Sequence, residues 1–419
     1  MKPCQLADKY RYIKGKYMSA KVYQSKNVLE ASRERISKSF DEFDRIYISF
    51  SGGKDSTVMT HLVLDEAKKR GVTVGLLIID LEAQYSDTIK HIEEMVELYK
   101  DNIDLHWFCG ELMLRNAVSN YEPRWVCWDK EKEADWVRPM PKLASDLSQY
   151  DFYVPKMEFE ELMVIFGQWY SQGKKTGAFI GIRSDESLHR YKAITSRKDG
   201  LMLNDWKWTT KVSNGLYNIY PIYDWRTEDI WTYHSKFKDK CHNEVYDKMT
   251  MAGVKISQQR LCQPYGDDQK KGLWLYHILE PDTWYKLIAR VNGVNSGSLY
   301  VQERGNISGS HKVTKPEGHT WESFCNLLLS TMPDATRDHY MFRFKKFMHG
   351  WRDRGYYEIP QEAPIELENK CFAPSWRRMC RVLLRNDYWC KGLGFTQPKS
   401  EAYGKFLQIR DARKCKQPN

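Results

Sequence analysis

Six residues near the start of the chain, Ser51-Gly-Gly-Lys-Asp-Ser56, combine the features of a phosphate-binding loop. They follow a short apolar run over 46–50 and precede a helix-like stretch over 57–70. A glycine turn between a strand and a helix gathers backbone N–H groups at the positive end of the helix dipole, where anions bind. The sequence therefore predicts that this loop, with its two serine hydroxyls, holds the phosphates of a nucleotide.

The inner residues of the loop each have a chemical role. Gly52 and Gly53 allow positive φ angles and a close approach of the backbone to the ligand. Lys54 adds a mobile positive charge. Asp55 would repel phosphate unless it binds Mg²⁺ or orients the lysine, so we expect a metal–nucleotide complex with this carboxylate as the candidate metal ligand.

Strand and helix patterns alternate after the loop, interrupted by a Trp- and charge-rich insertion over 125–141. We expect strands at Val72–Asp80, Ile103–Trp107 and Gly177–Ile182, and helices at Asn27–Phe40, Ser86–Tyr99 and Glu158–Ser171. This order predicts an α/β fold with a doubly wound, mostly parallel sheet. Ligands of such sheets bind beyond the carboxyl ends of the strands, which is where the loop falls.

The pattern changes to helices from about Cys241, and aromatic residues then recur at helical spacing. We therefore predict three parts. A helical extension covers 1–44, a nucleotide-binding domain covers 45–240, and a mainly α-helical domain covers 241–419.

The composition is that of a globular protein, with 42% hydrophobic and 29% charged residues among 419. No apolar run approaches the ~20 residues that span a bilayer, and the N-terminus lacks the apolar core of a signal peptide. We therefore expect a cytoplasmic protein that does not bind membranes. The net charge of +10 is compatible with a nucleic-acid partner or with a polyanionic nucleotide.

A second candidate segment begins at Gly181, directly after a predicted strand. Arg183 and Arg190 can reach a phosphate or sulfate, and the planar guanidinium favours bidentate contact. Glu186 can hold these arginines or a metal; the alternative is a surface ion-pair cluster. Asp80, at the end of another strand, is either an acceptor for a ribose hydroxyl or a solvated acid.

Three segments, beginning at Ser51, Gly181 and Tyr220, resemble the phosphoadenosine phosphosulfate (PAPS) reductase-like branch of the PP-loop superfamily. That branch carries the strings Ser-Gly-Gly-Lys-Asp-Ser, Gly-Ile-Arg-x-x-Glu-Ser-x-x-Arg and Tyr-Pro-Ile-x-Asp-Trp, and all three occur here in this order. The resemblance implies a PP-loop enzyme that binds ATP or PAPS with Mg²⁺. Such an enzyme cleaves or transfers a nucleotidyl or sulfo group.

The resemblance also implies roles for individual residues. Lys54 and Mg²⁺ would neutralise charge on the leaving phosphates, while Arg183 and Arg190 would clamp a phosphate or sulfate. Asp55 would orient the lysine or the metal. The candidate nucleotide-binding residues are Ser51, Gly52, Gly53, Lys54, Ser56, Asp80 and Glu186.

Longer strings narrow the resemblance, among them Cys262-Gln-Pro-Tyr-Gly-Asp-Asp and Asn386-Asp-Tyr-Trp-Cys-Lys391. They are similar to the immunoglobulin-binding regulator A (IbrA) proteins of prophages and other bacterial mobile elements. Members of that family often lie beside a ParB-like partner. This implies an alternative function, a nucleotide-responsive regulator that acts with a ParB-like protein or with DNA.

The cysteines depart from the family pattern. PAPS reductases use a C-terminal Glu-Cys-Gly thiolate, and this string is absent from the sequence. Cys415 lies in a basic tail that would lower its pKa, so it is either a replacement nucleophile or a simple tail thiol. Iron–sulfur relatives use paired cysteines, whereas Cys262 is alone in its region and Cys371, Cys380 and Cys390 are loosely spaced. We therefore expect no iron–sulfur cluster.

Overall fold

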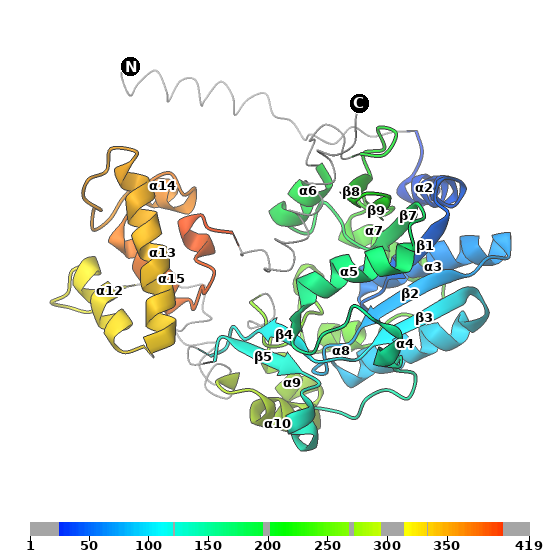
Figure 1. The fold of residues 1–419 in the computed structure, drawn as a ribbon, viewed down its shortest axis with the longest axis horizontal. Helices are drawn as coiled ribbons and strands as arrows, with labels where there is room; N and C mark the ends of the chain where they lie inside the picture. The colour runs from blue at the N-terminus through cyan, green and yellow to red at the C-terminus, as the bar shows by residue number, and fades with distance from the viewer. Residues whose placement is uncertain are drawn as a thin grey trace.

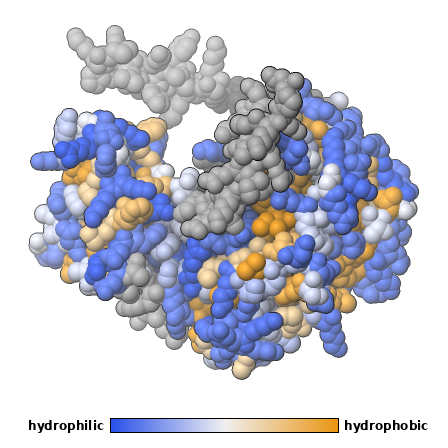
Figure 2. All heavy atoms as spheres, viewed as in Figure 1, coloured by the Kyte–Doolittle hydropathy of each residue, from blue (hydrophilic) through white to orange (hydrophobic). Residues whose placement is uncertain are grey.

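The computed structural model describes residues 25–119, 122–195, 202–267, 272–294, 314–332 and 334–396. Within these ranges the chain forms a larger α/β body and a smaller helical body (Figure 1). Each body has its own hydrophobic core; the first extends from Ile36 to Val294 and the second from Trp321 to Leu393. On the face in Figure 2, hydrophilic side chains dominate the surface of both bodies.

A six-stranded sheet forms the centre of the α/β body. In spatial order its strands are β3 (Ile103–Phe108), β2 (Val74–Ile79), β1 (Arg45–Ser49), β7 (Thr176–Ile180), β9 (Leu216–Ile219) and β8 (Thr209–Ser213). Every neighbouring pair is parallel except β8 with β9. The inner strands are near-continuous apolar runs because helices cover both faces of the sheet. The predicted doubly wound α/β fold is confirmed.

The order of the strands creates a crevice beside β1. The chain continues from β1 to β2 on one side, while β7 pairs with β1 on the other side. Ligands bind at such a reversal, at the carboxyl ends of the two strands. The Ser51–Ser56 loop follows β1 and the Gly181 segment follows β7, so the two predicted motifs meet at this point.

Helices surround the sheet, and the four predicted over 27–40, 57–70, 86–99 and 158–171 agree with the structure to within a few residues. The helices are α2 (Val28–Glu42), α3 (Lys54–Arg70), α4 (Ser86–Leu98), α5 (Phe159–Ser171), α6 (Leu188–Thr195), α7 (Thr227–Lys236), α8 (Val245–Met251), α9 (Trp274–Leu279) and α10 (Pro281–Arg290). In the described parts of the chain, none of the helices is long and apolar enough to cross a bilayer.

A second, small sheet was not predicted. It consists of β5 (Arg124–Cys127), β4 (Leu112–Arg115) and β6 (Met157–Glu158), in that order. Each strand is only a few residues long, which is why the sequence suggested no more than an insertion over 125–141. The sheet lies between the main sheet and the helical body (Figure 1).

The helical body consists of α12 (Trp321–Ser330), α13 (Asp334–Arg352), α14 (Ile365–Asn369) and α15 (Trp376–Leu384). The Ser375 hydroxyl accepts from the Arg378 N–H at 3.1 Å and caps α15. The aromatic side chains that recur at helical spacing on α13, Tyr340 and Phe344 among them, are buried in its core.

The two cores divide later than the predicted domain boundary at residue 241. Tyr246 on α8 and Leu287 on α10 are buried in the first core, together with Val294. Helix α2 also contributes Ile36 to that core. The sequence signal at 241 marks a change from strands to helices, and the helices that follow still pack on the same sheet.

The helical body contacts the α/β body through the segment that follows α15. The Asn386 side-chain amide donates to the backbone carbonyls of Ala117 at 2.9 Å and Ser119 at 3.1 Å. The Arg115 guanidinium lies 4.6 Å from the centre of the Tyr388 ring. Because Asn386 is only 2% exposed, the two bodies are packed together at this junction and water is excluded from it.

Candidate functional site

The loop after β1 has the geometry that its glycines predicted. Gly52 has φ +70°, and a Cβ at this position would lie 2.8 Å from the Thr88 side chain. Helix α3 begins at Lys54, and its N-cap residue Gly53 has no side-chain capping bond. The Ser51 and Ser56 hydroxyls lie 2.9 Å apart at the mouth of the loop. Residues of this loop line a cavity, and the Gly53 and Lys54 N–H groups already donate to the Ser51 and Tyr246 hydroxyls.

Three buried charges lie at this helix start, and we call Lys54, Asp55 and Arg183 the loop cluster. The Asp55 carboxylate accepts from Arg183 Nε at 2.6 Å and lies 3.3 Å from Lys54 Nζ. Their exposed fractions are 6% for Lys54, 8% for Asp55 and 2% for Arg183. Since two cations share one carboxylate, the loop keeps one net positive charge. The geometry favours the orienting role of Asp55 over its role as a metal ligand.

The Gly181 segment is pressed against the first turn of α3. A Cβ at Gly181 would lie 2.7 Å from Ser56 Cα, closer than real side chains approach a backbone atom. Only glycine allows this approach, and the approach brings Arg183 to Asp55. The structure thus joins two predicted motifs that are separated by more than a hundred residues in the chain.

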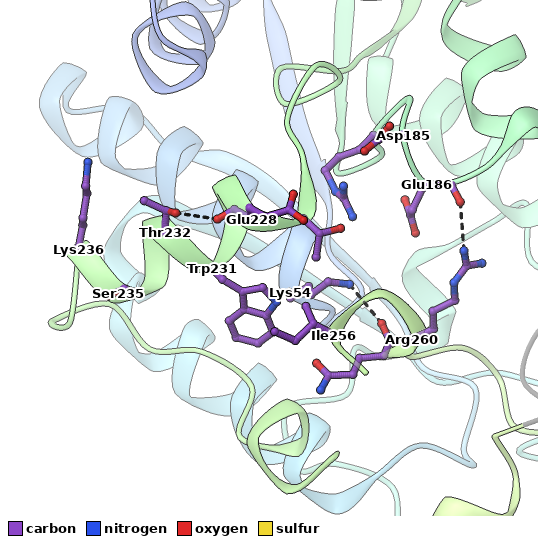
Figure 3. A pocket seen from close by; sticks show the side chains of 13 residues that line it. Lys54, Asp185, Glu186, Glu228, Trp231, Thr232, Ser235, Lys236, Ile256 and Arg260 are labelled. Carbon is purple, nitrogen blue, oxygen red and sulfur yellow. Dashed lines mark hydrogen bonds between the residues drawn. The ribbon is translucent and has the colours of Figure 1, made fainter. Parts of the chain in front are cut away.

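Two large cavities meet at Lys54. One, of about 740 Å³, is lined by the loop from Ser51 to Ser56 together with Glu186, Arg190 and Tyr246. The other, of about 710 Å³, is lined by Lys54, Arg183, Glu186 and Trp231 (Figure 3). The two arginines expected to clamp one anion therefore line different cavities.

Arg190 and Glu186 form an ion pair on the wall of the larger cavity. The Arg260 guanidinium adds a cation there and donates to the Glu186 backbone carbonyl at 3.1 Å. Lys391, from the segment after α15, lines the same cavity, so both bodies of the protein form its wall.

A third cavity, of about 180 Å³, lies at the carboxyl ends of β1 and β2 and shares Ser51 with the larger one. Its walls are mainly apolar and include Phe50, Ile79 and Leu81. Tyr85, another wall residue, stacks on Tyr276 with ring centres 3.8 Å apart. This small apolar space next to a phosphate loop has the character of a site for a planar base.

Asp80 does not face a cavity. Its side chain is completely buried; it accepts from Trp107 Nε1 at 3.1 Å and from the Glu82 N–H at 2.9 Å, and it pairs with Arg138. Contact with a ribose hydroxyl stays a prediction, and these contacts argue against it.

Two residues that sequence reasoning missed hold the loop from outside. The Asn243 side-chain amide donates to the Gly52 carbonyl at 2.9 Å, and the Tyr246 hydroxyl accepts from the Lys54 N–H at 3.1 Å. Both come from the stretch that follows α7, far from the loop in the chain. Their partners lie 191 and 192 residues earlier in the chain, so no local pattern could have pointed to them.

The described residues contain no group of three or more His, Cys, Asp or Glu that could hold a metal ion. Both oxygens of Asp55 face cations, Arg183 Nε and Lys54 Nζ, and the role of Asp55 as a metal ligand stays a prediction. Cys380 and Cys390 are buried in the second core, while Cys262 borders the cavities of about 740 and 180 Å³. Cys415 lies outside the described residues.

Comparison with known proteins agrees with this geometry. Residues 45–251 match the model of the phosphoadenosine phosphosulfate reductase domain, and residues 253–372 and 357–403 match a domain of unknown function, DUF3440. The uncharacterized protein YbdN of Escherichia coli is 41% identical over 383 residues, which are 91% of this chain and 93% of YbdN. This chain belongs to the YbdN family. Residues 45–251 of its α/β body form a PP-loop, PAPS reductase-like domain.

More distant similarities cover about half of the chain. The uncharacterized protein MJ0973 of Methanocaldococcus jannaschii is 28% identical over 207 residues, 48% of this chain and 38% of that protein. The PAPS reductase of Candida auris, solved as a phosphate complex, has a TM-score of 0.31 and 13% identity, and the match covers 55% of this chain and 94% of that one. The more specific resemblance of this chain to IbrA proteins stays a prediction.

Proposed function

We propose that this protein binds an adenine nucleotide at the loop cluster and transfers a nucleotidyl group from ATP to an acceptor. The observation that carries the proposal is the position of Lys54. It lies at the start of α3, between two cavities, with one net positive charge left on the loop cluster. Sulfo transfer from PAPS is the second candidate, supported by the match to the PAPS reductase domain.

The cavities offer a place for each part of the nucleotide. The apolar space beside Phe50 and Leu81 suits the base, and Ser51 links that space to the larger cavity. The triphosphate would then lie over the loop, within reach of the N–H groups at the start of α3. Magnesium would arrive with the phosphates, since substrate phosphates commonly supply most of its ligands.

The chemistry follows from this placement. A nucleophilic oxygen or nitrogen of the acceptor attacks the α-phosphorus, and the bond from that phosphorus to the bridging oxygen breaks. Pyrophosphate leaves with the electron pair, and the acceptor becomes an adenylate after losing its proton. Lys54 and the N–H groups stabilise the charge on pyrophosphate; one such donor is typically worth about 10²–10³ in rate.

The acceptor would enter through the larger cavity, which the helical body helps to close. Arg260 and Lys391 place positive charge there, and Phe395 adds an apolar surface. An acceptor with an anionic group and an apolar part is therefore favoured, because opposite charge raises its local concentration. This gives the helical body a function in selecting the acceptor.

Calorimetric titration with ATP, ADP, PAPS and adenosine 3′,5′-bisphosphate, each with Mg²⁺, tests the proposal when pyrophosphate release is followed in the same samples. ATP binding with pyrophosphate release would support nucleotidyl transfer. Binding of PAPS without pyrophosphate would favour sulfo transfer. Failure of all four ligands to bind would overturn the proposal.

The regulator alternative gives a different result in the same experiment. Nucleotide binding without turnover, combined with DNA binding whose affinity falls steeply with salt concentration, would favour it. Pull-down of a ParB-like protein only in the presence of nucleotide would favour it further.

A further inference from the structure

The Tyr246 hydroxyl lies at the point where α3 begins. It accepts a hydrogen bond from the Lys54 N–H at 3.1 Å, although the two residues are 192 positions apart in the chain. The side chain is 2% exposed, and the Trp231 ring packs edge-on against it at 5.8 Å. The packing therefore fixes the hydroxyl against the loop.

This hydroxyl keeps one proton to donate. A phenol can both accept and donate, and within the described residues the Tyr246 hydroxyl makes its hydrogen bond as an acceptor only. Burial raises the pKa of Tyr246 well above its usual range, so the group stays protonated. Because Tyr246 also lines the cavity of about 740 Å³, an acceptor atom can reach it from that side.

We infer that the Tyr246 hydroxyl is a phosphate-binding group, which donates to an oxygen of the pyrophosphate part of the nucleotide. This inference rests on the proposed function, because it places the phosphates at the loop. The Lys54 N–H donates to the hydroxyl and the hydroxyl donates to the phosphate. Such a chain polarises each bond in the same direction and strengthens the contact with the anion.

A purely structural role is the competing explanation. The hydroxyl would then only satisfy an N–H group that the helix start leaves without an intrahelical partner. Both roles predict a loss of stability when the hydroxyl is removed. They differ in whether the loss of ligand affinity depends on the phosphates, and this difference can be measured.

The test is the variant Tyr246→Phe, which keeps the ring and removes the hydroxyl. A matched control is Tyr265→Phe, whose hydroxyl is equally buried in the same core and donates to the Leu287 carbonyl at 3.2 Å. Calorimetry would compare inorganic pyrophosphate, ATP and adenosine, each with Mg²⁺. We expect Tyr246→Phe to bind pyrophosphate and ATP about 10- to 100-fold more weakly, the usual range for a hydrogen bond to a charged group.

Adenosine binding should be unchanged in Tyr246→Phe, and all three ligands should bind the control as they bind the wild type. An equal loss for adenosine and ATP, or no loss at all, would overturn the inference while the wild-type titration still supports the proposed function. If wild-type protein binds neither pyrophosphate nor ATP, the proposed function and the inference both fail.

A second measurement does not depend on the folding of a variant. 3-Fluorotyrosine at position 246 retains the hydroxyl, and its ¹⁹F signal reports on the hydrogen bond. We expect pyrophosphate to shift this signal and adenosine to leave it in place. If calorimetry shows that pyrophosphate binds but the ¹⁹F signal does not shift, direct contact between the hydroxyl and the phosphate is contradicted.

Discussion

Two buried groups of charges lie beyond neighbouring strands of the sheet, and they differ in what they contact. The loop cluster follows β1 and borders two cavities. The other group, which we call the sealed cluster, follows β2 and consists of Asp80, Glu82, Arg138 and Arg290.

The sealed cluster directs its hydrogen bonds into the protein. Glu82, which is completely buried, accepts from the Trp128 N–H at 2.7 Å, the Val137 N–H at 3.1 Å and Arg290 Nε at 2.8 Å. Its φ of +65° is unusual for a residue with a side chain. These contacts join the end of β2 to the insertion over 125–141 and to α10. Burial of charge alone therefore does not indicate a ligand site; a cavity beside the charge does.

The largest expected effect is a loss of unfolding free energy when a residue of the sealed cluster is substituted. Glu82→Ala leaves Arg290 buried without its carboxylate, and removing one partner of a buried pair costs about 3–5 kcal/mol of unfolding free energy. Urea denaturation of the variant measures this loss. Glu93→Ala, which removes an exposed acid on α4, is the control. A loss close to that of the control would show that the sealed cluster does not hold the fold together.

Lys54→Ala, in the loop cluster, should weaken ligand binding strongly and change the stability of the fold only slightly. We expect ATP to bind at least about 100-fold more weakly, because the variant removes the charge that faces the phosphates, whereas stability should change by only about 1 kcal/mol. Calorimetry and urea denaturation measure the two effects. Lys236→Ala, an exposed cation at the edge of the cavity of about 710 Å³, is the control. Unchanged ATP affinity in Lys54→Ala would remove the loop cluster from the site.

A third effect depends on pH. His61, His91 and His234 are buried around the loop cluster, and burial lowers their pKa values to about 4, 3 and 4. Between pH 6.5 and about 4 the unfolded chain binds protons that the folded chain excludes, so stability is complete above pH 6.5 and is lost as the pH falls.

His234→Leu should reduce the slope of unfolding free energy against pH by about 1.4 kcal/mol per unit in this window. Denaturation between pH 5 and 7 measures it, with His349→Gln on the surface as the control. A slope identical to wild type would mean that His234 is protonated in the folded protein.

The smallest effect concerns the helical body. Lys391→Ala should weaken ATP binding about threefold at low salt, because a solvated cation at the cavity wall contributes only a fraction of a kcal/mol. The difference should disappear at about 0.5 M salt, where screening is strong. Lys345→Ala on α13 is the control. An effect that persists at high salt would indicate direct contact rather than a contribution to the field.

Local patterns were enough to predict the loop and four of the six strands of the main sheet, whereas β8 and β9 were not predicted. Continuous apolar runs such as 74–79 specify buried strands, and Gly52 and Gly53 specify the turn before α3. The meeting of the loop with the Gly181 segment also followed, because parallel strands end at one edge of the sheet.

Long-range pairings could not be predicted in the same way. Nothing near Tyr246 in the sequence indicates a partner 192 residues earlier. Asp80 does lie at the end of a strand, as predicted. Its carboxylate, however, bonds inward to Trp107 and Arg138, and the contact with Arg138 depends on how the insertion over 125–141 folds. The domain boundary at 241 stays a prediction, because a change from strands to helices does not reveal which surface the helices cover.

The junction at Asn386 has an evolutionary consequence. Its amide bonds to backbone carbonyls of Ala117 and Ser119, and every amino acid provides such a carbonyl. Substitutions on the α/β side can therefore accumulate without loss of these two bonds, whereas position 386 needs an amide that also tolerates φ +47°. Among relatives of this chain, we expect residue identity to vary at 117 and 119 within the small side chains that these buried positions allow, and to stay fixed at 386.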